Sequence, residues 1–143
     1  MQMLLRIEYP LMLRVPRTCV TFGTLLFALG CGGGDRAEVS GKVTRANGSP
    51  LVGARVIARS DATGKSANGI TDNDGRYVLS MVDPGDGVPA GDYKASIIEY
   101  RGMGDNMRPA SISLKYGNPD ESGLTFAISG GEEKVFDVVV DPL

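Results

Sequence analysis

The chain has 143 residues, with 15 lysines and arginines, 17 aspartates and glutamates, and no histidine or tryptophan. A formal net charge of −2 provides no basic stripe to replace counterions on phosphate, so the composition argues against binding of nucleic acid or of anionic membrane surfaces. Without histidine, an imidazole general base and a Ser-His-Asp triad are excluded. The 20 glycines and 8 prolines favour many turns between short strands.

Residues 1–30 have the order of a secretory signal peptide. Arg6, Arg14 and Arg17 come first, and an uncharged stretch that ends in a small residue follows. As a helix, its apolar part would span about 15 Å, half of the ~30 Å hydrocarbon core of a bilayer, so we expect no stable transmembrane helix here. The start codon stays open between Met1 and Met12, because the stretch from Met12 forms a compact signal by itself.

Cys31 follows the apolar run and precedes three glycines. The stretch LLFALGC resembles the lipobox of bacterial lipoproteins, although Ala28 stands where that family usually has leucine and Leu29 where it usually has alanine or serine. The resemblance implies that the Cys31 thiol receives a diacylglyceryl group and that the cysteine becomes the new N-terminus. Cys31 is therefore the expected site of lipid attachment, with acyl chains such as palmitate, and residues 31–37 form the expected flexible tether.

A disulfide between Cys19 and Cys31 is the alternative for these two cysteines. It would place one partner inside the signal peptide, which cleavage before Cys31 would remove. The anchored form would face the periplasm or the exterior from the inner or the outer membrane. The choice of membrane and the oligomeric state stay open at this point.

From residue 38 onward, apolar and polar residues alternate with a period of two, which is typical of strands with one buried face. Strands are expected at 38–45, 51–60, 76–81, 92–100, 124–129 and 134–140, with a short one near 70–72. The expected inward side chains are Val39, Gly41, Val43, Val52, Ala54, Val56, Ala58, Tyr77, Leu79, Met81, Tyr93, Ala95, Ile97, Phe126, Ile128, Phe136, Val138 and Val140. About seven such strands predict an all-β sandwich of two packed sheets.

The sequence also predicts local features in two of the strands and in one turn. Ile98 and Tyr100 fall on the face opposite Ile97, which predicts a bulge or a sheet edge there. Gly53 would keep the second strand thin where the opposing sheet approaches. The Asn-Asp-Gly turn at 73–75 supplies the positive φ that a tight hairpin requires.

The stretches VSGKVTRANGSPLVGARVIARS, GITDNDGRYVLS and GDYKASI share an ordered pattern of glycines, turn residues and β-formers. Together they resemble the carboxypeptidase regulatory-like domain family. This resemblance implies a seven-stranded, transthyretin-like Greek-key β-sandwich over residues 38–143, related in shape to the Cna-B modules of surface proteins. The C-terminal part resembles a subgroup of short bacterial lipoproteins. Such domains are accessory modules of many kinds, so the resemblance indicates a fold more specifically than a function.

Two constellations have both a chemical and a structural interpretation. Asp72 and Asp74 could donate oxygens to calcium, but the twelfth position of an EF-hand loop would be Asp83 instead of glutamate. The alternative is a hairpin turn whose side chains bond their own backbone. Lys42 and Asp137, on the first and last strands, could form the internal isopeptide bond of Cna-B modules. Alternation places both on the outer face, where a solvated ion pair is the preferred interpretation.

The loop 101–110 combines Met103 and Met107 with Arg101 and Arg108, side chains that adapt well to a partner surface. The alternative is a variable surface loop without a partner.

We expect no catalytic residue, no metal and no cofactor. The expected function is that of a non-enzymatic lipoprotein, anchored through Cys31, that presents one sandwich for contact with a protein or a polysaccharide of the cell envelope. The alternatives are a calcium- or carbohydrate-binding envelope domain, a purely structural spacer, and a hydrolase of small ligands, for which the family's histidines are missing.

Overall fold

The computed structural model describes residues 35–143; the expected signal peptide and Cys31 lie outside the described residues. Nine strands and two short 3₁₀ helices cover this part of the chain. In order they are β1 (Arg36–Arg45), β2 (Arg55–Arg59), β3 (Ser66–Ile70), β4 (Arg76–Leu79), β5 (Val88–Pro89), β6 (Gly91–Ile98), η1 (Gly104–Asn106), η2 (Leu114–Gly117), β7 (Leu124–Ile128), β8 (Glu133–Val135) and β9 (Val138–Val140).

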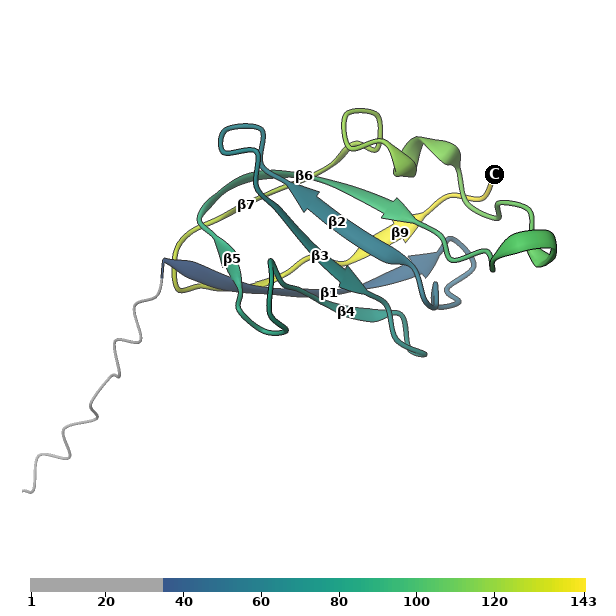
Figure 1. Ribbon diagram of the computed structural model, residues 1–143, viewed down its shortest axis with the longest axis horizontal. Coiled ribbons are helices and arrows are strands. Elements are labelled where there is room, and N and C mark those ends of the chain that lie inside the picture. Colours follow the sequence, from purple (N-terminus) through teal and green to yellow (C-terminus); the bar gives the residue numbers. More distant parts are fainter. Residues whose placement is uncertain (1–34) are drawn as a thin grey trace, which may run out of the picture. The chain divides into compact units, whose positions relative to one another are not determined.

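The strands form two sheets, which lie against each other as two layers (Figure 1). In the first sheet β1 is central: β4 and β5 pair with it antiparallel, and β8 and β9 pair with it parallel. The second sheet has the order β3-β2-β6-β7 and is antiparallel throughout. A bridge between Asn68 and Ser80 connects β3 with the end of β4 and joins the two sheets along one side.

The core between the sheets consists of the side chains that alternation places inward. It includes Val39, Val43, Ala54, Val56, Ala58, Tyr77, Leu79, Tyr93, Ala95, Ile97, Phe126, Ile128, Val138 and Val140, all buried. Burial of a Val, Leu, Ile or Phe side chain contributes roughly 1.5–3 kcal/mol, so this core is the main source of stability. The expected all-β, two-sheet sandwich is confirmed.

Val52 is one inward prediction that is wrong, because it is 46% exposed. Gly53 next to it has φ +71°, so the chain turns here and the strand begins later than expected. The Thr71 hydroxyl fastens this turn: it accepts the N–H of Ala54 at 2.8 Å and donates to the carbonyl of Leu51 at 2.6 Å. Leu51 is therefore buried in place of Val52. Gly53 serves a turn and does not thin a strand.

Of the two alternatives expected near Ile98, the described structure has the edge and not the bulge. β6 pairs with β2 in an unbroken register up to Ile98, whereas its pairing with β7 ends at Ala95, so the last residues of β6 have no paired strand on that side. Ile98 and Tyr100 are exposed because the strand ends there and the chain enters a loop.

Three elements differ from the expected boundaries. β3 and β5 lie in stretches expected as loops, and each buries one small or medium side chain, Ala67 or Val88. The expected last strand, 134–140, is split into β8 and β9. Both halves pair with the same edge of β1 in one continuous register, and the residues between them, Phe136 and Asp137, interrupt the ladder beside Gly41.

Gly41 permits this interruption because it has no side chain to occupy the space of the Phe136 carbonyl. A Cβ at this position would lie 2.6 Å from the carbonyl carbon of Phe136 and closer still to its oxygen. The Tyr77 hydroxyl donates to the same Phe136 carbonyl at 2.5 Å. The Phe136 ring packs on Phe126 with ring centroids 4.7 Å apart. Burial, with a smaller effect of the nearby Asp137 charge, raises the pKa of Tyr77, so its hydroxyl stays protonated and able to donate.

The carboxylate of Asp86 ties the beginning of β1 to the loop before β5. It accepts the N–H groups of Met81 at 2.7 Å and of Val82 at 3.0 Å, and it lies 3.0 Å from the guanidinium of Arg36. The Met81 bond, followed by those from Val82, Asp83 and Arg36, lowers the pKa of Asp86 against the opposing effect of partial burial.

We predict that Gly41→Ala destabilises the domain by about 1–3 kcal/mol, because main-chain atoms of Phe136 must move to admit the methyl group. Gly117→Ala is the matched control, since a Cβ there meets nothing within 4 Å, and it should change the free energy of unfolding by less than about 0.5 kcal/mol. Urea unfolding of both variants measures the difference. Equal stabilities would contradict the close approach of the Phe136 carbonyl to Gly41.

We also predict that Asp86 stabilises the fold in a pH-dependent manner. Its folded pKa lies below its unfolded value, so the stabilisation is present above about pH 4 and is lost as the pH falls through the lowered pKa. The difference in Tm between wild type and Asp86→Asn should therefore shrink from about pH 5 to about pH 3. Asp92→Asn, at an exposed position, is the control that should show no such trend.

Candidate functional site

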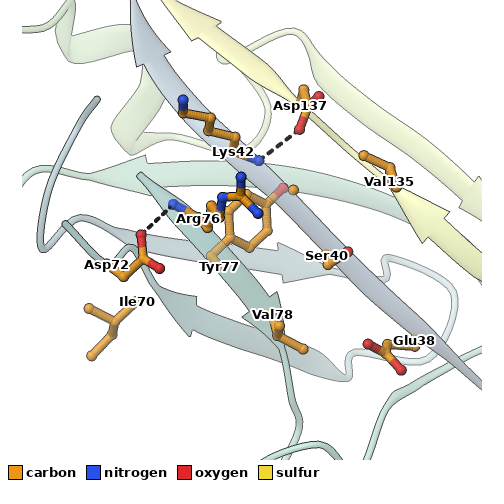
Figure 2. A pocket seen from close by; sticks show the side chains of 11 residues that line it. Glu38, Ser40, Lys42, Ile70, Asp72, Arg76, Tyr77, Val78, Val135 and Asp137 are labelled. Carbon is orange, nitrogen blue, oxygen red and sulfur yellow. Dashed lines mark hydrogen bonds between the residues drawn. The ribbon is translucent and has the colours of Figure 1, made fainter. Parts of the chain in front are cut away.

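The outer face of the first sheet contains an open groove of about 730 Å³ (Figure 2). It lies over β1, β4 and β8 and reaches the turn that follows β3. Three aliphatic side chains on its surface are exposed: Ile70 by 61%, Val78 by 46% and Val135 by 67%. The charged groups along it are Glu38, Lys42, Asp72, Arg76 and Asp137.

The strand registers arrange these side chains in cross-strand rows. Ser40 of β1 pairs with Val78 of β4 and with Val135 of β8, which makes one apolar row. Two residues further along β1, Lys42 pairs with Arg76, which makes a cationic row. Two residues in the other direction, Glu38 pairs with Glu133, which makes an acidic row. Because side chains on one face repeat every two residues, the rows are about 7 Å apart along β1.

The cationic and acidic rows each place like charges opposite one another, an arrangement that destabilises a sheet in isolation. Within residues 35–143, neither Lys42 nor Arg76 takes part in any of the ion pairs of the structure, and neither do Glu38 and Glu133. The groove therefore contains charge that the described part of the chain leaves uncompensated.

The two aspartates of the groove bind backbone instead of the cations. Asp137 Oδ1 accepts the N–H of Lys42 at 2.8 Å, and Asp72 Oδ1 accepts the N–H of Arg76 at 2.8 Å (Figure 2). Lys42 and Asp137 are thus brought together on the outer face, as expected, but by an amide–carboxylate bond. The expected ion pair between their side chains is wrong for the described structure.

The Asp72–Asp74 stretch forms the expected hairpin turn. Asp72 Oδ1 also accepts the N–H of Asp74 at 2.9 Å, and Gly75 has φ +78°. One oxygen of the supposed calcium ligand is therefore already used by two amides. Within the described residues, no group of three or more His, Cys, Asp or Glu side chains has the geometry of a metal site.

A second charged cluster, on the outer face of the other sheet, satisfies its own charges. Lys94 Nζ lies 2.7 Å from a carboxylate oxygen of Asp61 and 2.7 Å from one of Asp120, and Arg59 lies 3.1 Å from Asp61. The hydrogen bond from Lys94 lowers the pKa of Asp120. This cluster connects a loop to the sheet, whereas the groove on β1 leaves its cations unpaired.

The loop 101–110 contains η1 and lies at the opposite end of the sandwich from the start of β1 (Figure 1). Met103 is 76% exposed and Met107 54% exposed. Arg108 bonds the loop's own backbone, its N–H to the carbonyl of Arg101 at 2.7 Å and its guanidinium to that of Tyr100 at 3.2 Å. The expected partner-contact role of this loop stays a prediction.

Among residues 35–143 there is no helix with the length and hydrophobicity that a membrane span requires. The groove was not anticipated from the sequence. The sequence evidence for it was Val78, an apolar residue at an outward position between the inward Tyr77 and Leu79. The strands that pair with β1 and complete the rows could not be identified from the sequence.

The model of the carboxypeptidase regulatory-like domain matches residues 38–129, which is more than half of the chain. The chain therefore belongs to this family, whose domains are non-catalytic modules with an immunoglobulin-like fold. No curated protein matches the sequence.

Several solved structures are similar to the sandwich. The TIE protein of Bacillus anthracis matches with 18% identity and a TM-score of 0.50 over 76% of this chain and 17% of its own. The major pilin subunit of Bacillus cereus matches with 17% identity and a TM-score of 0.49 over 73% of this chain and 30% of its own. The first of these similarities supports the fold alone. The chain spans less than a third of either protein.

We predict that Lys42 and Asp137 remain unlinked, because their outer-face position leaves the amine charged and the carboxylate bound to an amide. Peptide mapping by mass spectrometry should recover the peptides that contain them separately. A joined peptide that is lighter by one water, and that disappears in Lys42→Gln, would contradict this.

Proposed function

We propose that this protein is a non-enzymatic lipoprotein of the bacterial cell envelope, attached to a membrane through Cys31, and that its groove on β1, β4 and β8 contacts a partner macromolecule. The observation that carries the contact is the groove itself, where exposed aliphatic side chains lie between rows of uncompensated charge. Surface patches of this kind are typical of interaction sites, because apolar area and unpaired charge both gain from a partner.

Three observations support a module without catalysis. The sequence has no histidine, and the family consists of non-catalytic domains. Among the described residues, the carboxylates with lowered pKa, such as Asp86 and Asp120, are explained by hydrogen bonds that hold loops to the sheets. None of them lies in the groove.

The attachment through Cys31 rests on the lipobox-like stretch and is consistent with where the fold begins. β1 starts at Arg36, so only residues 32–35 separate the proposed lipid from the sheet. Three of these four residues are glycines, a composition typical of linkers. The loop 101–110 then lies at the end of the sandwich far from the anchored end (Figure 1).

The anchor is tested by growing producing bacteria with radioactive palmitate. The wild-type chain should incorporate the label and fractionate with membranes, because the acylated cysteine provides buried hydrocarbon. Cys31→Ser should lose the label, and Cys19→Ser, the matched control, should keep it. Label retained in Cys31→Ser, or absent from the wild type, would contradict the anchor.

The contact surface is tested in the same membranes with a photo-crosslinking amino acid at Val78. Crosslinks should form there and not at Thr125, an exposed position on the outer face of the second sheet. Equal crosslinking at both positions would contradict a specific surface.

A further inference from the structure

The order of the rows along β1 indicates what kind of partner the groove accepts, an inference that rests on the proposed contact function. We infer that the groove binds an extended segment of a partner polypeptide in which a basic, an apolar and an acidic side chain occupy alternate positions. The basic side chain would lie over Glu38, the apolar one between Val78 and Val135, and the acidic one over Lys42 and Arg76.

The spacing of the rows favours an extended chain. Rows on one face of β1 are about 7 Å apart, which is the distance between alternate side chains of a strand. A segment that runs along β1 would therefore present every second side chain to one row after another. From Glu38 to Lys42 the groove covers about 13 Å, the length of a segment of roughly five residues.

Charge complementarity determines which end of the partner segment is acidic and which is basic. Lys42 and Arg76 are register partners and share one face, so a single carboxylate can interact with both. Asp137 and Asp72 offset part of this positive charge, but the Oδ1 of each is bound to a backbone N–H, of Lys42 and of Arg76 respectively. At the other end, Glu38 and Glu133 are register partners and would gain from a cation.

The middle row favours a polypeptide over a polysaccharide. Val78 and Val135 are aliphatic and exposed by 46% and 67%, and Ile70 beside them is exposed by 61%. Among residues 35–143, Tyr77 is the aromatic residue that lines the groove, but it is directed to the core and is 3% exposed, so it offers no flat face for a sugar ring. An aliphatic side chain of a peptide would bury its surface here.

The test titrates the full chain, in detergent micelles, with capped peptides, while backbone amide shifts are followed by NMR. The probe has the core Lys-Thr-Val-Thr-Glu, and the reversed order is a second probe because the direction along β1 is open. We expect saturable shifts confined to β1, β4 and β8 with one of the two. The uncharged analogue, with Gln at both ends, should bind about fivefold more weakly.

Reversal of the charges in the groove distinguishes specific recognition of the peptide from nonspecific electrostatic attraction. The double variant Lys42→Glu/Arg76→Glu should bind the peptide with one Lys end and one Glu end about fivefold or more weakly than wild type does. It should instead prefer a peptide with Lys at both ends of the core. Lys65→Glu/Arg101→Glu is the matched control: it changes the net charge equally at residues outside the groove and should stay within about twofold of wild type.

Three results would overturn the inference: no saturable binding of either probe, equal loss in the control variant, or shifts at the same amides with polygalacturonate but not with the peptides. The titration does not depend on acylation. A failed titration with palmitate labelling and crosslinking intact would therefore remove only this inference. Loss of labelling would remove only the anchor.

Discussion

The contact of the Phe136 carbonyl with the bare backbone of Gly41 and with the Tyr77 hydroxyl is the interaction on which the first sheet depends. It allows the C-terminal segment to turn toward the core at Phe136, between β8 and β9, while both strands pair with the same edge of β1 in one register. β1 thereby becomes a central strand. A side chain at position 41 would occupy the space of that carbonyl, and the protonated phenol of Tyr77 satisfies an acceptor that burial would otherwise leave unpaired.

The same interruption between β8 and β9 shapes the outer face. Because the chain kinks at Phe136, Asp137 bonds the N–H of Lys42 and stands where a regular strand would continue the ladder. β8 ends beside Ser40 and completes the apolar row with Val135. The groove is thus a consequence of how the interior is packed, and its charges remain unpaired because the carboxylates nearest to them serve the backbone.

The two sheets use their outer faces differently. On β6, Lys94 and its aspartate partners neutralise one another and hold a loop, so this cluster is explained by the fold itself. On β1, cations face cations and carboxylates face carboxylates across the register. Sheets usually avoid such pairs, which cost stability. Their presence around exposed aliphatic side chains is the basis of the proposed contact with a partner.

Much of this protein follows from the sequence by itself. Alternation determined the all-β class and most inward residues, such as Val39 and Ile97, because period two leaves one face apolar wherever the chain is extended. It failed at Val52, and it did not foresee the break in the last strand at Phe136, since turn geometry and strand pairing there depend on distant groups: the hydroxyl of Thr71 and the bare Gly41. The groove was decided by tertiary structure alone. Its rows join positions that are 34, 38 or 95 residues apart along the chain. A sequence pattern reports the period of one strand but not which strands lie beside it.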